Sequence, residues 1–247
     1  MSGTKPARPI PVIVTRSEPG ARHTCQRLAQ QGYFALSSPA LDLVRSPDVS
    51  LPDFSRHSGL VFTSANGVRF LTAETRLRDL PCWCVGPATA EAARMAGFHT
   101  VYQSSGNALQ LAEFILARGG RDGMPLAHIA NAEAEGKLAA RLALGHQSVT
   151  FVPLYQAQPA HDLAISVRKT LESELPAIVM IHSAKAALAF AYLARHLPHT
   201  GLSSVVISRQ AGEPLNRIGL TRICFADHPD EDGMFRALKK AHMALSA

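Results

Sequence analysis

The sequence predicts an α/β protein of two similar domains, each a doubly wound parallel sheet, with a ligand cleft between the domains. First, strand-like apolar runs alternate with helical stretches along the chain, the order that gives parallel sheets with helices on both faces. Second, Gly59–Phe70 (GLVFTSANGVRF) is echoed by Ala177–Phe190 (AIVMIHSAKAALAF), with Met180–Lys185 aligned on Val61–Asn66. Third, 247 residues suffice for two small domains.

In the first half, each element is recognised by its apolar pattern or its boundary residues. Pro11–Val14 is a short β-branched run, and Glu18–Gln31 has helical spacing that stops at Gly32, a preferred C-cap residue. Tyr33–Val44 alternates as an extended segment does. The other expected elements are strands Leu60–Phe62, Pro81–Val85 and His99–Gln103, a helix from Ala65, a helix after Thr89 that ends at Gly97, a helix Asn107–Arg118 and a break at Gly119–Gly123.

The second half follows the same order as the first. Ser208 falls opposite Gly86, and Gly219 falls opposite Gly97. A repeat of about 120 residues has the size of a small α/β domain, so it indicates tandem duplication. The expected elements are strands Leu126–Ala130, Val149–Ala157, Ser204–Ile207 and Ile223–Ala226, with helices Ala134–Leu144, Asp162–Leu175 and Gly233–Ala244 beside the repeated strand and helix.

Small and polar residues follow the expected strands, where doubly wound sheets bind ligands. A helix that starts there offers unpaired N–H groups and a positive dipole end to a carboxylate or phosphate. The serines and threonines are either helix N-caps or parts of a ligand site. Their occurrence in two matched sets favours a cleft between domains. These strand ends are Thr15-Arg16, Thr63-Ser64, Gly86-Pro87-Ala88-Thr89, Ala130-Asn131, His182-Ser183 and Ser208-Arg209.

Composition disfavours several function classes. The net charge of +6 comes mostly from scattered arginines, and aromatic residues make up only 6%, whereas nucleic-acid binders gather charge into a stripe with aromatics. The planar arginine fork suits carboxylates, although a solvated surface explains any single arginine as well. No glycine-rich dinucleotide, phosphate-loop or nucleophile-elbow motif occurs.

The cysteine and histidine spacings do not indicate a metal site or disulfides. Cys25, Cys82, Cys84 and Cys224 form no Cys-x-x-Cys pair, so free thiols in a reducing compartment are expected. The histidines follow no ligand pattern, and no apolar run reaches the ~20 residues of a membrane span. We therefore expect a cytoplasmic protein without metal, membrane or nucleic-acid partners.

Tyr155 stands out because it places a phenol in the expected strand Val149–Ala157. A phenol near an anionic ligand is able to act as a proton donor. A tyrosine is equally able to pack a hinge through its ring. The residue itself does not decide between these two roles.

Four motifs together resemble the uroporphyrinogen-III synthase family. They are Val12-Ile13-Val14-Thr15-Arg16, Phe62-Thr63-Ser64-Ala65-Asn66-Gly67-Val68, Val85-Gly86-Pro87-Ala88-Thr89-Ala90 with Gly97, and the strand Val152–Tyr155. The resemblance implies a cofactor-free, monomeric lyase of haem biosynthesis that binds a small-molecule polycarboxylate, the linear tetrapyrrole hydroxymethylbilane. The family closes this chain with loss of water and inversion of the fourth ring.

The resemblance also implies a domain layout and roles for single residues. Residues 1–38 with 160–247 would form one domain and 45–150 the other, joined by linker strands 39–44 and 151–159. Tyr155 would be the proton donor to the departing hydroxyl. Ser64, Thr89 and Ser183 would be binding positions, with Thr63, Pro87 and Ser208 lining the same strand ends. We expect Thr15, Arg16 and His182 to bind substrate as well, because they follow strands at the same edges.

Two features depart from the family pattern. The second copy has Ser208–Gly212 where many members keep a glycine and a threonine, and Ala130–Glu135 is acidic, which would repel a carboxylate. We expect glutamine at positions 133 and 135 to leave turnover little changed. There are two alternatives to synthase activity: a binding protein for a small anion, and a non-catalytic regulatory relative of the synthase.

Overall fold

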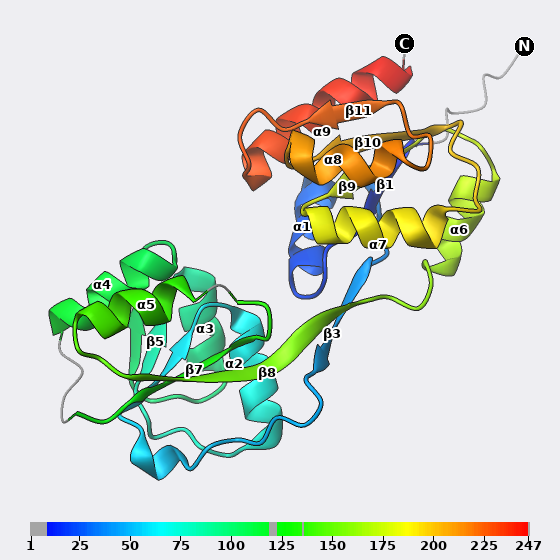
Figure 1. Ribbon diagram of the computed structural model, residues 1–247. Coiled ribbons are helices and arrows are strands. Elements are labelled where there is room, and N and C mark those ends of the chain that lie inside the picture. The colour runs from blue at the N-terminus through cyan, green and yellow to red at the C-terminus, as the bar shows by residue number, and fades with distance from the viewer. Residues whose placement is uncertain (1–8, 119–122, 135, 247) are drawn as a thin grey trace, which may run out of the picture. The chain divides into compact units, whose positions relative to one another are not determined.

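The computed structural model describes residues 9–118, 123–134 and 136–246. The chain divides into two compact units, Met1–Leu43 with Gln158–Ala247 (unit 1) and Val44–Ala157 (unit 2). Both are mixed α/β with parallel sheets (Figure 1), which confirms the predicted fold class. Glu135 and most of the expected break at Gly119–Gly123 lie outside the described residues.

Unit 1 has a parallel five-stranded sheet in the order β11-β10-β9-β1-β2. Helices α1 and α9 pack against one face through a core that includes Val14, Leu28, Met180 and Leu238. The strands are β1 (Pro11–Val14), β2 (Phe34–Ser37), β9 (Ala177–Ile181), β10 (Leu202–Val206) and β11 (Ile223–Phe225); the helices are α1 (Gly20–Gln30), α6 (Ile165–Glu172), α7 (Ala184–Ala194), α8 (Arg209–Asn216) and α9 (Glu231–Ser246).

Unit 2 contains most of a six-stranded sheet in the order β3-β8-β7-β4-β5-β6. Helices α2 and α3 cover one face of this sheet, and α4 and α5 cover the other. The strands are β3 (Leu41–Arg45), β4 (Gly59–Phe62), β5 (Cys82–Cys84), β6 (Val101–Gln103), β7 (Leu126–Asn131) and β8 (Val149–Pro159); the helices are η1 (Phe54–Arg56), α2 (Ala65–Glu74), α3 (Pro87–Met95), α4 (Ala108–Arg118) and α5 (Lys137–Leu144).

The structure confirms the sequence repeat element by element. The series β4-α2-β5-α3-β6-α4 in unit 2 recurs as β9-α7-β10-α8-β11-α9 in unit 1. Gly97 and Gly219, which follow α3 and α8, have φ angles of +90° and +79°, a backbone region that favours glycine. The equivalent glycines therefore end equivalent helices in the same way.

The expected extended segment Tyr33–Val44 is in fact two strands in different sheets. After β2, the N–H groups of Ser38 and Ala40 donate to Val14 O and Thr15 O, and β3 then pairs with β8. Pro39 lies at this break, where the missing N–H of proline suits the change of partner. Strands β3 and β8 both run from one unit into the other. The exact domain limits inferred from the family stay a prediction.

The four cysteines are free, as the spacing predicts. Cys82 and Cys84 are fully buried in β5, whereas Cys25 and Cys224 are half-buried. Burial raises the pKa of the Cys84 thiol to about 12, so that thiol is inert at neutral pH. In the described part of the chain, no helix is long and apolar enough to cross a membrane.

Gly67 fixes how α2 packs on the sheet. A Cβ at this position would come within 2.6 Å of the Ile129 carbonyl oxygen in β7. We expect Gly67→Ala to lower the free energy of unfolding by about 1–3 kcal/mol, because backbone cannot move aside as a side chain does. Urea unfolding followed by circular dichroism measures this loss.

The matched control is Gly86→Ser, since Ser208 occupies the equivalent position in the repeat. A Cβ at Gly86 meets nothing within 4 Å. This variant should stay within about 0.5 kcal/mol of the parent chain, the usual range for an unhindered surface substitution. Equal losses for both variants would show that the Ile129 contact does not control α2 packing.

Candidate functional site

The predicted site residues lie at the carboxyl edges of the two parallel sheets, the edges at which the strands end and helices begin. In each unit, the strand β4 or β9 is fully buried and turns directly into a helix. Ser64 caps α2 by accepting a hydrogen bond from Asn66 N at 3.2 Å, and Ser183 caps α7 by accepting from Ala186 N at 3.1 Å. A capping serine keeps its own O–H, which remains able to donate to a carboxylate.

In unit 2, Tyr155 lies beside the start of α2. It is paired with Asn131 across the β7–β8 ladder, and its side chain is 4% exposed. Its ring stacks on Phe70 of α2, with a centroid distance of 4.9 Å and an interplanar angle of 2°. The stack and the ladder together fix the phenol.

The surroundings of Tyr155 keep its phenol protonated. Burial raises the pKa of Tyr155 above its usual value, and the nearby Ser64 hydroxyl and Arg69 guanidinium offset only part of that rise. A neutral phenol next to a helix N-terminus is a proton donor over the whole physiological pH range.

Thr63 is held by a buried histidine that the sequence does not single out. Its Oγ1 lies 3.1 Å from Nε2 of His128, a β7 residue that is only 3% exposed. Burial lowers the pKa of His128 to about 4, so this ring is neutral at pH 7. His128 therefore fixes the rotamer of Thr63 at the carboxyl edge of the sheet without adding a charge there.

The β5–α3 turn contributes Pro87 and Thr89. Gly86 is the N-cap and Pro87 the first helical residue, where the missing N–H of proline costs nothing. Pro87 is exposed at the edge, whereas Thr89 is 5% exposed, so its hydroxyl points mostly into the protein.

In unit 1, two of the predicted hydroxyls already have structural partners. Thr15 Oγ1 donates to Met180 O at 2.7 Å and is fully buried, which ties β1 to β9. Ser208 caps α8 by accepting from Ala211 N at 3.2 Å. The N-cap interpretation thus holds for Ser64, Ser183 and Ser208 alike.

Arg16 and His182, also predicted as binding residues, meet a carboxylate that sequence reasoning missed. Arg16 Nη1 donates to Glu231 Oε2 at 2.8 Å, and His182 Nε2 lies 3.4 Å from the same oxygen. Thr24 Oγ1 donates to the other oxygen, Glu231 Oε1, at 2.8 Å. Burial alone would raise the pKa of Glu231, but the contacts with His182 and Thr24 and the charge of Arg16 lower it to about 2.

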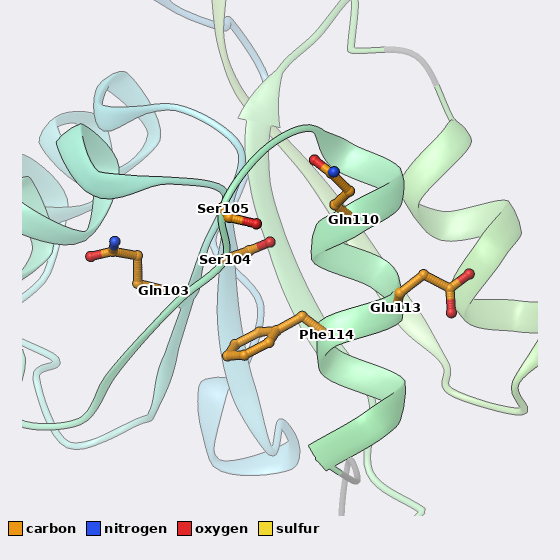
Figure 2. Close-up of a pocket in the computed structure, with 6 residues that line it drawn as sticks. All are labelled: Gln103, Ser104, Ser105, Gln110, Glu113 and Phe114. Carbon is orange, nitrogen blue, oxygen red and sulfur yellow. The ribbon is translucent and has the colours of Figure 1, made fainter.

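Unit 2 also has a separate pocket of about 410 Å³ between the end of β6 and α4 (Figure 2). Ser104 and Ser105 point toward α4, while Glu113 points away from them and pairs with Arg141. Phe114 packs edge-on against Trp83 at the pocket floor. None of the residues predicted from the sequence lines this pocket.

No cluster suited to a metal ion accompanies these edges. Over the residues that the structure describes, no three His, Cys, Asp or Glu side chains are arranged to hold one. The functional groups at these edges are hydroxyls, a phenol, helix N-termini and the Arg16–Glu231–His182 cluster.

The fold and its two polar strand-end clusters define a duplicated α/β protein suited to an anionic ligand at the carboxyl edges of its sheets. The chain belongs to the uroporphyrinogen-III synthase family, because the family model described as "Uroporphyrinogen-III synthase HemD" matches residues 23–236. Members of this family are lyases of tetrapyrrole biosynthesis. A comparison with curated protein sequences finds no match.

Two solved structures are similar to this chain over most of its length. The uroporphyrinogen-III synthetase from Helicobacter pylori has a TM-score of 0.63 and 16% identity over 94% of this chain and 99% of its own. A mutant uroporphyrinogen III synthase from Thermus thermophilus has a TM-score of 0.46 and 15% identity over 95% of this chain and 99% of its own. At such identity, the Helicobacter structure supports the fold alone.

The partners of Glu231 predict an acid-sensitive contribution to stability. Its pKa is about 2 in the folded chain against an ordinary 4.5, so its contribution is fully present above pH 4.5 and disappears as the pH falls toward 2. Glu231→Gln should lower Tm at pH 7, and this deficit should vanish between pH 4.5 and pH 2 in thermal unfolding followed by circular dichroism.

Asp232→Asn is the control for this measurement. Asp232 pairs with Arg27, but its side chain is 68% exposed against 21% for Glu231. Exposed pairs contribute little, so its Tm should change less at pH 7. A Glu231→Gln deficit that persists at pH 2 would contradict the assignment.

Proposed function

We propose that the chain closes hydroxymethylbilane into uroporphyrinogen III with Tyr155 as the proton donor, at the carboxyl edge of the unit 2 sheet. The observation that carries this proposal is the fixed, buried phenol of Tyr155 beside the N-terminus of α2. Ring closure begins with loss of the hydroxyl group, and a neutral phenol is able to protonate that leaving group.

The substrate is a flexible polycarboxylate, and the strand-end residues supply donors without metal. The hydroxyls of Ser64 and Ser183 lie at helix N-termini, where the dipole favours negative charge. Thr63, held by His128, offers a third neutral contact in unit 2. Neutral donors bind carboxylates without placing a positive charge beside the cation-like intermediate that forms when the protonated hydroxyl departs as water.

Thr15, Pro87, Thr89 and Ser208 have a smaller part in this proposal. Thr15 and Thr89 are buried, so they would support the residues at the edge by packing and would not contact the substrate directly. Pro87 and Ser208 begin α3 and α8 and would line the edge through backbone and cap atoms. The acidic strand end after β7 contributes no binding group: Glu133 is exposed, and glutamine there should leave turnover unchanged.

Incubation with freshly prepared hydroxymethylbilane tests the function. An active chain gives mainly the type III ring, whereas a non-catalytic binder leaves the type I product that forms spontaneously. The isomers are oxidised and separated by chromatography. A yield of type I alone would refute the proposed activity.

Tyr155→Phe tests the phenol. We expect kcat to fall at least about tenfold, because general acid catalysis contributes 10²–10⁴-fold in typical cases. Tm should stay within about 2 °C, since the stack on Phe70 is retained. Initial rates of type III formation measure the loss.

Tyr102→Phe is the matched control. Tyr102 lies in β6, where its ring stacks on Trp83 of β5, and it is not among the predicted site residues. Tyr102→Phe also removes a phenolic oxygen, but away from the proposed site, so kcat should stay within about twofold of the parent value. Unchanged turnover in Tyr155→Phe would remove the phenol from the mechanism.

A further inference from the structure

Arg16 differs from three other arginines of the chain in the way it holds its carboxylate, although Arg27 and Arg168 also use a single nitrogen. Three arginines, Arg45, Arg141 and Arg236, each grip both oxygens of one carboxylate through Nε and Nη2. This fork is the strongest geometry for a structural pair. Arg16 instead uses a single nitrogen, Nη1, which donates to Glu231 Oε2 at 2.8 Å and to Thr24 Oγ1 at 3.3 Å.

The carboxylate of Glu231 is shared in a way that prevents a fork. Its second oxygen accepts from Thr24 Oγ1 at 2.8 Å, and Thr24 is fully buried. Its first oxygen also lies 3.4 Å from His182 Nε2. Glu231 is therefore fixed from three sides and presents only one oxygen to Arg16.

Among the described residues, no carboxylate pairs with the remaining edge of the Arg16 guanidinium. Within the described residues, the side-chain hydrogen bonds of Arg16 all leave from Nη1, and the side chain is 35% exposed. Gly20 lies against this part of the guanidinium: a Cβ there would come within 2.8 Å of Arg16 Nε and 3.2 Å of Nη2, so only glycine leaves room for this orientation. Nε and Nη2, the pair that grips carboxylates elsewhere in the chain, are thus unshared.

The location matches the carboxyl edge of the unit 1 sheet. Arg16 follows β1, and Glu231 touches His182, which directly precedes the α7 cap Ser183. The carboxyl edge of the unit 1 sheet therefore has both an arginine and a helix N-terminus, two features that favour negative charge.

We propose that Arg16 binds a carboxylate of the linear tetrapyrrole through its Nε–Nη2 edge, and that Glu231 and Thr24 are positioning residues that hold this edge open. This inference rests on the proposed function. Glu231 takes one end of the guanidinium, and Thr24 prevents Glu231 from rotating to take both. A flexible arginine is thereby presented in one orientation, which lowers the entropy cost of binding.

The test compares KM and kcat for type III formation in five variants. Arg16→Ala should raise KM about tenfold with kcat within about twofold, because a charge-assisted contact to the substrate is lost. Arg16→Lys should raise KM nearly as much, since lysine lacks the planar fork. Glu231→Gln should raise KM about threefold, a smaller effect because glutamine retains the Thr24 contact while losing its charge.

Asp232→Asn is the matched control, because it removes the same charge from the same turn of α9. Asp232 pairs with Arg27, away from Arg16, and should leave KM unchanged. The double variant Arg16→Ala with Glu231→Gln should have the KM of Arg16→Ala alone, since Glu231 acts only through Arg16. A purely structural role would instead give additive effects.

An unchanged or lower KM in Glu231→Gln, or additivity in the double variant, would overturn the proposal. Titration calorimetry with the octacarboxylate uroporphyrin III repeats the comparison without turnover. The same order of affinities is expected there, and equal affinities for the parent chain and Arg16→Ala would refute the binding role. A parent chain that yields only type I product would refute the proposed function separately, since the calorimetric comparison still decides the role of Arg16.

Discussion

The abrupt turn from a buried parallel strand into a helix is the constraint on which the rest of this structure depends. Such a turn leaves the first N–H groups of the helix at the sheet edge, where a capping side chain or a ligand must satisfy them. The chain makes this turn twice in equivalent form, at Ser64 and Ser183. Its binding capacity follows from that duplication.

The two copies have diverged in charge while keeping the same backbone. Unit 2 has Thr63, backed by the neutral His128, and the phenol of Tyr155. At the position equivalent to Thr63, unit 1 has His182, which meets the charged pair of Arg16 and Glu231. In the mechanism that we propose, the unit 2 edge donates the proton and the unit 1 edge binds a carboxylate of the substrate.

Local signals in the sequence suffice for the strand–helix order, the repeat and the serine caps. Ser64 and Ser183 are predictable because a buried run stops at a residue that prefers the N-cap position. Glu231 is not predictable in this way, because its contact with Arg16 joins residues 215 positions apart. The role of His128 is not predictable for a related reason. A histidine inside an apolar strand has no local signal, and its contact with Thr63 depends on the pairing of β7 with β4.

We infer that main-chain and hydroxyl donors at the α2 and α7 N-termini hold the carboxylates of the ligand. Amide chemical shifts in ¹⁵N-labelled protein, recorded while uroporphyrin III is added, test it most directly. We expect the largest changes at Ala65 and Ala184, the first amides of these helices, and smaller changes at Asn66 and Ala186, whose N–H groups already donate to the capping serines. Changes confined to the pocket formed by Gln103–Ser105 and α4, with these amides unmoved, would contradict it.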